Sequence, residues 1–239
     1  MSAAAKGVSV PGNPAPPSFG RAFSKFGALP DTADELREIA GVLRADVNRD
    51  LYLGRRATEA NVRSAVLDDR RVVAFATHGL APGDIVGLDQ PALVLSDPKL
   101  SGEAGVDDGL LTMDEVLGLK LDADWVVLSA CNTASADGAG TEAISGLARA
   151  FFFAGARSLL VSNWAVETTS ARLLTTELFK RQALDPGLSR AEALRQSMLA
   201  LMGKEATDAK DGTKPFSYAH PAFWAPFSLV GDNGIGRGR

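Results

Sequence analysis

The sequence is poor in the residues that build disulfides and metal sites. It has one cysteine, Cys131, and two histidines, His78 and His220, among 239 residues. A single cysteine cannot form an internal disulfide, and no C-x-x-C pair with the spacing of a metal site is present. These absences exclude a disulfide-stapled fold and a cysteine-rich zinc site, and we expect neither a metal nor a cofactor.

Long apolar runs and an excess of positive charge are absent as well. No segment approaches the roughly 20 apolar residues of a membrane span, and residues 1–17 lack the apolar centre of a signal peptide. The 25 basic and 29 acidic residues leave a net charge of -4, so no basic field attracts nucleic acid or anionic lipid. We therefore expect no nucleic-acid or membrane partner, and a reducing cytoplasm as the compartment.

The composition divides the chain into an arm and one domain. Residues 1–28 are rich in Pro, Gly, Ser and Ala, which predicts a loose arm or linker, with residues 6–10 as a short strand candidate. Over the whole chain, 46% of residues are apolar and 23% are charged, which is typical of a globular protein. We therefore expect a single domain over residues 29–239.

Strand and helix patterns alternate within this domain. Short apolar runs of the kind buried on both faces of a sheet lie at residues 71–76, 124–130 and 158–164, with further strand candidates at 91–97 and 224–232. Amphipathic or apolar helices are predicted at residues 32–46, 58–69, 112–119, 142–156, 170–184 and 189–202. The alternation predicts an α/β domain with a mostly parallel sheet and helices on both faces.

Several helix starts and one apolar helix give finer expectations. Three starts have Ser or Thr followed three residues later by Glu, which is typical of a capping box: Thr32/Glu35, Thr112/Glu115 and Ser189/Glu192. The strongly apolar helix at 142–156 contains three consecutive phenylalanines, Phe151–Phe153, which we assign to the core. Gly155 is expected to end this helix.

The two residues with nucleophile and base chemistry follow two of the buried strands. His78 comes after the strand at 71–76 and Cys131 directly after the strand at 124–130. In a parallel sheet, catalytic groups gather beyond the carboxyl ends of the strands, and neighbouring strands lie about 4.8 Å apart. An adjacent imidazole activates a thiol. Gly79 would let the backbone turn after His78 and offer its N–H to an oxyanion.

The residues alone also allow a structural interpretation of this pair. A lone buried cysteine is more often a packing residue, so position along the chain brings the two interpretations only to about equal weight. Asn132 is a weaker candidate for orienting His78, because consecutive side chains diverge, and we favour a loop role. His220 precedes a proline among aromatic residues, where a structural role is favoured.

Five segments together carry a resemblance to a known family. FATHG, GLLTMDEVLGLKL, VVLSACNT, GLARAFFFAGARSLLVSNW and HPAFWAPFSLVGD occur in order between about Leu29 and Asp232. The chain thereby resembles a CHAT domain, a family akin to caspases and separases. The resemblance implies a caspase-hemoglobinase-like three-layer sandwich and a cysteine endopeptidase dyad formed by His78 and Cys131. It also implies a protein or peptide substrate and a tetratricopeptide-repeat or other sensor partner.

One segment departs from the family pattern. Relatives typically have Trp-x-Val followed by two acidic residues, whereas this chain has Thr168 after Glu167. Thr168 stands where separases carry the acid that faces a basic P1 side chain. Glu167 is the nearest candidate carboxylate for such a pocket, with Trp164 as a flanking wall. The alternative, which we favour slightly, is that Glu167 caps the following helix.

These observations predict a cysteine peptidase in which His78 deprotonates Cys131 and protonates the leaving amine. The backbone N–H groups of Gly79 and Cys131 would hold the oxyanion. The resemblance indicates that a partner or sensor region regulates this activity. The alternative function is a catalytically silent module that binds a partner or signals.

Overall fold

The computed structural model describes residues 26–27, 29–101, 107–132, 139–164, 166–205 and 216–234. The side chains of residues 30, 101, 130–132 and 139–145 lie outside this description, as does the strand candidate at residues 6–10. Nearly all of the expected arm is therefore untested, and the domain boundary at residue 29 stays a prediction.

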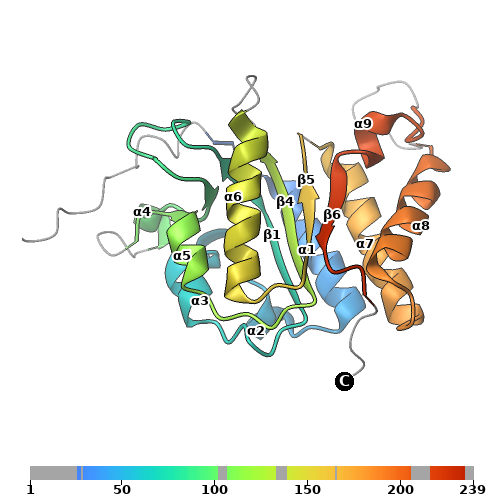
Figure 1. Ribbon diagram of the computed structural model, residues 1–239, viewed down its shortest axis with the longest axis horizontal. Helices are drawn as coiled ribbons and strands as arrows, with labels where there is room; N and C mark the ends of the chain where they lie inside the picture. The colour runs from blue at the N-terminus through green and yellow to red at the C-terminus, as the bar shows by residue number, and fades with distance from the viewer. Residues whose placement is uncertain are drawn as a thin grey trace, which may run out of the picture.

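The described residues form helices and strands that alternate along much of the chain (Figure 1). The helices are α1 Pro30–Leu43, α2 Val47–Asp50, α3 Glu59–Ser64, α4 Pro98–Ser101, α5 Met113–Leu117, α6 Ala139–Ala154, α7 Thr168–Leu184, α8 Arg190–Met202 and α9 Pro221–Trp224, with a 3-10 turn at Gly54–Arg56. The strands are β1 Val72–Leu80, β2 Ala92–Val94, β3 Leu110–Thr112, β4 Trp125–Asn132, β5 Ser158–Ser162 and β6 Phe227–Gly231.

The strands of the described residues form one six-stranded sheet in the order β3-β2-β1-β4-β5-β6. The central pairs β1–β4 and β4–β5 are parallel, and the remaining three pairs are antiparallel. The expectation of a mostly parallel sheet is therefore wrong. β1 and β2 are joined by residues 81–91 without a helix, and a parallel pairing needs a longer crossover connection.

Helices cover both faces of the sheet, as the sequence predicted (Figure 1). One apolar cluster joins α5 and α6 to residues of β1, β4 and β5, including Val73, Val126 and Leu159. A second cluster joins α1, α7 and α8 to the opposite face through Trp125, Val127 and Leu160. Alternate residues of each strand thus supply two separate cores, which explains why these strands are continuous apolar runs.

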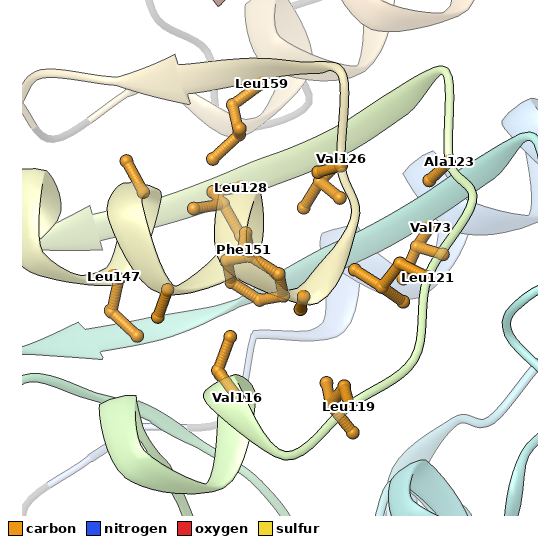
Figure 2. Packing of buried hydrophobic residues seen from close by; sticks show 14 of the residues in the cluster. Val73, Val116, Leu119, Leu121, Ala123, Val126, Leu128, Leu147, Phe151 and Leu159 are labelled. Carbon is orange, nitrogen blue, oxygen red and sulfur yellow. The ribbon is translucent and has the colours of Figure 1, made fainter.

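The three phenylalanines of α6 do not all belong to the core. Phe151 is fully buried and packs beside Leu128 and Leu147 over the sheet (Figure 2). Phe153, in contrast, is 82% exposed, so its assignment to the core is wrong. Phe151 and Phe153 are two residues apart, which corresponds to a rotation of about 200° around the helix axis. Because Phe151 faces the sheet, Phe153 points away from it.

Only one of the three expected capping boxes is complete. Thr112 accepts a hydrogen bond from the N–H of Glu115, and the Glu115 carboxylate accepts from the N–H of Thr112, which confirms that box. The Ser189 hydroxyl accepts from the N–H of Glu192, whose carboxylate binds Arg195 instead. The Thr32/Glu35 box is wrong. Helix α1 begins at Pro30 without a side-chain cap, and Glu35 is drawn into the interior.

No helix among the described residues combines the length and apolar character that crossing a bilayer would require.

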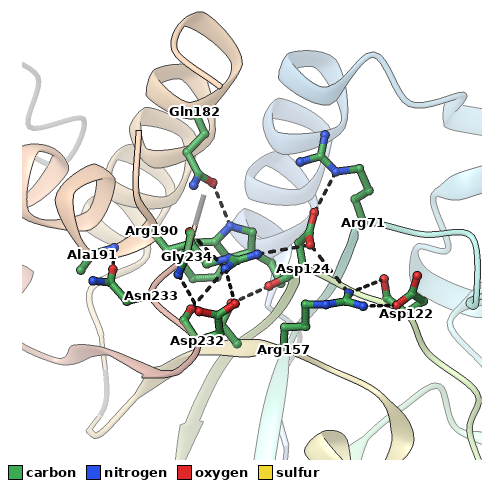
Figure 3. Close-up of polar contacts among 12 residues, drawn as sticks. Arg71, Asp122, Asp124, Arg157, Gln182, Arg190, Ala191, Asp232, Asn233 and Gly234 are labelled. Atoms are coloured by element: carbon green, nitrogen blue, oxygen red, sulfur yellow. Dashed lines mark hydrogen bonds and ion pairs between the residues drawn. The ribbon is translucent and has the colours of Figure 1, made fainter. Parts of the chain in front are cut away.

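A buried carboxylate holds the amino edge of the central strands (Figure 3). Asp124, one residue before β4, lies 2.9 Å from Nε of Arg71, which directly precedes β1. Its other oxygen lies 3.2 Å from Nη2 of Arg190 and 3.7 Å from Nη1 of Arg157. Arg157 directly precedes β5, and Arg190 opens α8 and is only 1% exposed. One carboxylate therefore connects the starts of three strands and a helix.

Arg190 is also held by residues outside this pairing. Its guanidinium lies 6.0 Å from the ring of Trp125, and Nη1 donates to the carbonyl oxygen of Gly234 at 3.1 Å. The indole N–H of Trp125 in turn donates to Gln182 of α7 at 2.8 Å. Because Arg190 is fully desolvated, its charge depends on these partners and on Asp124.

Asp124→Asn is expected to lower the free energy of unfolding by about 3 kcal/mol, because it leaves the buried Arg190 without its buried counter-charge. Urea unfolding followed by tryptophan fluorescence measures this loss. The matched control is Glu192→Gln, which breaks an exposed ion pair with Arg195 on the same helix and should change stability far less. Equal losses in the two variants would contradict the assignment.

A second buried carboxylate joins α1 to the sheet and to α7. Glu35 is 3% exposed, and its two oxygens accept hydrogen bonds from the hydroxyls of Ser129 on β4 at 3.2 Å and Thr175 on α7 at 3.1 Å. Burial raises the pKa of Glu35 to about 7, and the two hydroxyl donors only partly offset that rise. The carboxyl group is therefore uncharged in the folded chain at mildly acidic pH.

This pKa makes stability depend on pH. Unfolded Glu35 ionises near pH 4.5, whereas the folded chain keeps its proton up to about pH 7. The contribution of protonated Glu35 to the free energy of unfolding is therefore fully present below pH 4.5. It is lost as the pH rises through 7, and the total loss is about 3 kcal/mol.

Glu35→Gln should therefore remove this loss, so that the variant gains stability relative to the wild type between pH 5 and pH 8 by about 3 kcal/mol. Burial also raises the pKa of Glu59 to about 7, so Glu59 adds a similar pH dependence to both proteins. The quantity to compare is therefore the difference in free energy of unfolding between the wild type and Glu35→Gln at each pH. Asp34→Asn, an exposed carboxylate on the same helix, serves as the control. A difference that does not vary with pH would rule out the Glu35 assignment.

Candidate active site

The two sequence-predicted reactive residues are direct neighbours across the sheet. β1 and β4 are parallel and pair in one register over eight residues, from Val72 opposite Trp125 to Gly79 opposite Asn132. Within this register His78 is the partner of Cys131. The expectation that the two strands are adjacent and end at the same edge of the sheet is confirmed. The side chain of Cys131 lies outside the described residues, and the backbone alone places it.

The strand ends differ from the sequence prediction in one respect. β1 continues through His78 and Gly79 to Leu80, and His78 therefore belongs to the strand and does not follow it. Gly79 pairs with Asn132 on one side and with Leu93 of β2 on the other, so the expected backbone turn at Gly79 is wrong. Likewise, Asn132 is the last residue of β4 and not a loop residue. Pairing on both sides keeps this end of β1 extended.

The imidazole of His78 is covered by the segment that precedes α1. Its Nε2 lies 3.0 Å from the carbonyl oxygen of Gly27, and its ring centroid lies 5.5 Å from that of Phe26. The other ring nitrogen, Nδ1, is buried and has no hydrogen-bond partner among the described residues. The chain itself therefore occupies one of the two nitrogens that could exchange a proton with a thiol.

The start of α7 lies near the same edge of the sheet, because it follows the carboxyl end of β5. Both carboxylate oxygens of Glu167 accept backbone hydrogen bonds, from the N–H of Thr169 at 2.9 Å and of Ser170 at 2.7 Å. Glu167 is thus the cap of α7, which is the alternative that the sequence favoured. Trp164, two residues beyond β5, is 46% exposed.

Thr168 connects this helix start to α1. Its hydroxyl donates to the carboxylate of Asp31 at 2.9 Å, one residue into α1. The buried Tyr218 lies near the same helix start: burial raises the pKa of its hydroxyl, and the Glu167 carboxylate raises it further. Sequence patterns did not single out Asp31 or Tyr218, since each depends on contacts between segments far apart in the chain.

His220 has the structural role that the sequence favoured. Its Nδ1 accepts a hydrogen bond from the N–H of Ala222 at 3.2 Å and thereby caps the short helix α9. The sequence missed Phe26 and Gly27, which belong to the stretch assigned to a loose arm. The one available signal was an aromatic residue in a Pro- and Gly-rich stretch immediately before a helix.

Metal ligands were not expected at this edge. The described residues contain no group of three or more His, Cys, Asp or Glu side chains arranged to hold a metal ion. The register at this edge places an imidazole beside a thiol-bearing strand position.

Comparison with known proteins agrees with the resemblance seen in the sequence. The chain is 25% identical over 255 residues to tetratricopeptide repeat protein 28 of Mus musculus, and 26% identical over 251 residues to that of Homo sapiens. Each match covers 95% of this chain but only 10% and 9% of the relative, so the chain spans about a tenth of their length. The model of the CHAT domain matches residues 4–232, nearly the whole chain, and this protein belongs to the CHAT domain family.

Proposed function

We propose that this chain is a cysteine endopeptidase with a caspase-hemoglobinase-like fold, in which His78 and Cys131 form the catalytic dyad. The observation that carries the proposal is the register of β1 and β4, in which His78 and Cys131 are partners at the carboxyl edge of two parallel strands. Neighbouring strands lie about 4.8 Å apart, which is within reach of an imidazole and a thiol. Membership of a family related to caspases supports the same chemistry.

The dyad would act by covalent catalysis. His78 takes the proton of the Cys131 thiol, and the thiolate attacks the carbonyl carbon of a peptide bond. His78 then gives that proton to the leaving amine as the C–N bond breaks, which leaves a thioester on Cys131. Water, deprotonated by His78, attacks the thioester, releases the carboxylic acid product and restores the thiol. The N–H groups of Gly79 and Cys131 are our candidates for holding the oxyanion.

The proposal includes a compartment and a regulator. A nucleophilic thiol persists in a reducing environment, so we place the activity in the cytoplasm. The relatives are named for tetratricopeptide repeats, and this chain corresponds to about a tenth of their length. The substrate in this proposal is a protein or peptide. A tetratricopeptide-repeat or other sensor partner is our candidate for the regulator of its cleavage.

The alternative function is a catalytically silent module that binds a partner. The cover that Phe26 and Gly27 form over the His78 imidazole favours it, because these residues stand where a substrate would approach the candidate base. An electrophilic peptide probe decides between the two functions. A peptidyl acyloxymethyl ketone forms a thioether only with an activated thiol, and mass mapping of the adduct should locate it at Cys131.

Cys131→Ala and His78→Ala should each lower peptide turnover by at least about a thousandfold while unfolding remains cooperative. The matched control is His220→Ala, which removes the cap of α9, should cost about 1 kcal/mol of stability and should leave turnover in place. Turnover of fluorogenic peptides and thermal unfolding are measured on the same samples. Turnover that persists in Cys131→Ala would contradict the dyad, and a wild type without turnover would favour the silent module.

The P1 preference tests the remaining site candidates. Because both oxygens of Glu167 are engaged by backbone N–H groups, Glu167→Gln should weaken the cap of α7 and leave the P1 preference unchanged. Trp164 stays our candidate for a wall of the pocket, and Trp164→Ala should raise KM. Cleavage of a P1-varied peptide library by the wild type and both variants measures these effects. Loss of an Arg or Lys preference in Glu167→Gln would assign its carboxylate to the pocket after all.

A further inference from the structure

Phe26 lies at an apolar surface beside His78. It is half-buried and packs against a cluster of buried residues, namely Leu80, Ile85, Leu88, Ala92, Val94 and Leu110. These residues come from the end of β1, from β2 and β3, and from the connection after β1. The same phenyl ring contacts the imidazole of His78, so one side chain lies against both the apolar surface and the candidate base.

The walls of this surface are built independently of Phe26. The connection after β1 is closed by its own hydrogen bonds: the Asp84 carboxylate accepts from the N–H of Ala81 at 2.6 Å, and the Leu88 carbonyl accepts from the N–H of Gly83 at 2.8 Å. Leu80 pairs with Ala92 between β1 and β2, and Leu110 pairs with Val94 between β2 and β3, so strand pairing holds these residues without Phe26. The surface would therefore persist if Phe26 left, and a side chain of similar size could take its place.

The backbone beside Phe26 occupies His78 as well. Neutral imidazole carries one proton, and an Nε2 that donates it to the Gly27 carbonyl leaves only Nδ1 able to accept a proton. Departure of Phe26 and Gly27 would free Nε2 and expose the apolar surface together. One segment thus contacts the candidate base and fills the adjacent apolar surface.

The helix after this segment has anchors of its own, which involve neither Phe26 nor Gly27. The Asp31 carboxylate accepts from Thr168, and the Thr32 hydroxyl donates to the Leu29 carbonyl at 2.7 Å. Glu35 fixes α1 further along through Ser129 and Thr175. Departure of Phe26 and Gly27 from His78 would therefore leave the anchors of α1 in place.

We propose that the apolar cluster of Leu80, Ile85, Leu88, Ala92, Val94 and Leu110 is a substrate subsite for a large apolar side chain, and that Phe26 fills it as an internal inhibitor. The subsite takes an aromatic or long aliphatic residue of an extended peptide. The inference rests on the proposed peptidase function, whose substrate it specifies. A peptide side chain must displace Phe26 before it can occupy the subsite beside His78.

The first experiment tests the contact without any use of activity. The chain has two histidines, so long-range ¹H–¹⁵N spectra of the imidazoles contain two sets of signals, which His220→Gln assigns. In Phe26→Ala the signals of His78 should shift, because the phenyl ring 5.5 Å away is lost, while those of His220 should not. Coincident His78 signals in the wild type and Phe26→Ala would overturn the inference, whatever the activity.

The second experiment measures the rate at which a peptidyl acyloxymethyl ketone labels Cys131. Phe26→Ala should be labelled about tenfold faster than the wild type, a factor that corresponds to 1.4 kcal/mol. Phe153→Ala is the matched control, because Phe153 is 82% exposed on α6 and should leave the rate unchanged. Phe26→Leu, which keeps an apolar side chain for the cluster, should stay near the wild-type rate.

Probe sequence then tests the ligand class. In Phe26→Ala, probes with Phe or Leu at one position should label faster than probes with Asp or Ser at that position. An equal rate for all probes, or an equal rate in Phe26→Ala and the wild type, overturns the subsite. If Cys131 is labelled in no variant, the proposed function fails and the inference fails with it, and the His78 spectra show that the failure lies in the chemistry and not in the contact.

Discussion

The interaction of Asp124 with three arginines is the constraint from which the geometry of the site follows. Asp124 joins the residues that open β1, β4, β5 and α8, and it is 3% exposed. From this edge β1 and β4 run in register for eight pairs, until His78 meets Cys131. A slip of one residue would turn every side chain of β1 to the opposite face. An ionic cluster at one edge of the sheet thereby supports the candidate dyad at the other edge.

The two edges of the sheet carry different kinds of groups. The amino edge is charged and fully engaged by arginines, whereas the carboxyl edge combines an imidazole, helix starts and an apolar cluster. The interior between them contains Glu35, whose raised pKa reflects its distance from water. Because Glu35 binds Ser129, two residues before Cys131 on β4, the docking of α1 and the strand of the candidate nucleophile share one hydrogen-bonded group.

Helix α1 has a second function in this arrangement, because it delivers the segment that covers His78. Gly27 lies three residues before Pro30, the first residue of α1. The helix is therefore the anchor of the segment that contacts the imidazole. Its attachment through Asp31, Glu35 and Glu38 to α7 keeps that anchor in place: Thr168, Thr175 and Arg172 are the partners on α7.

The sequence by itself determined the central strands, most helices and the proximity of His78 and Cys131. Apolar runs and local start and stop signals carry this information, as with the Thr112/Glu115 box and with Gly155, whose φ of 114° ends α6. Contacts between distant segments decided the rest. Tertiary structure alone set the strand β3, the antiparallel pairing of β2 and β6, the burial of Glu35 in place of a cap, and the exposure of Phe153. It also placed Phe26 and Gly27 on His78. A local pattern records which residues prefer to be buried or to cap a helix, but the partner that satisfies each group comes from packing across the whole chain.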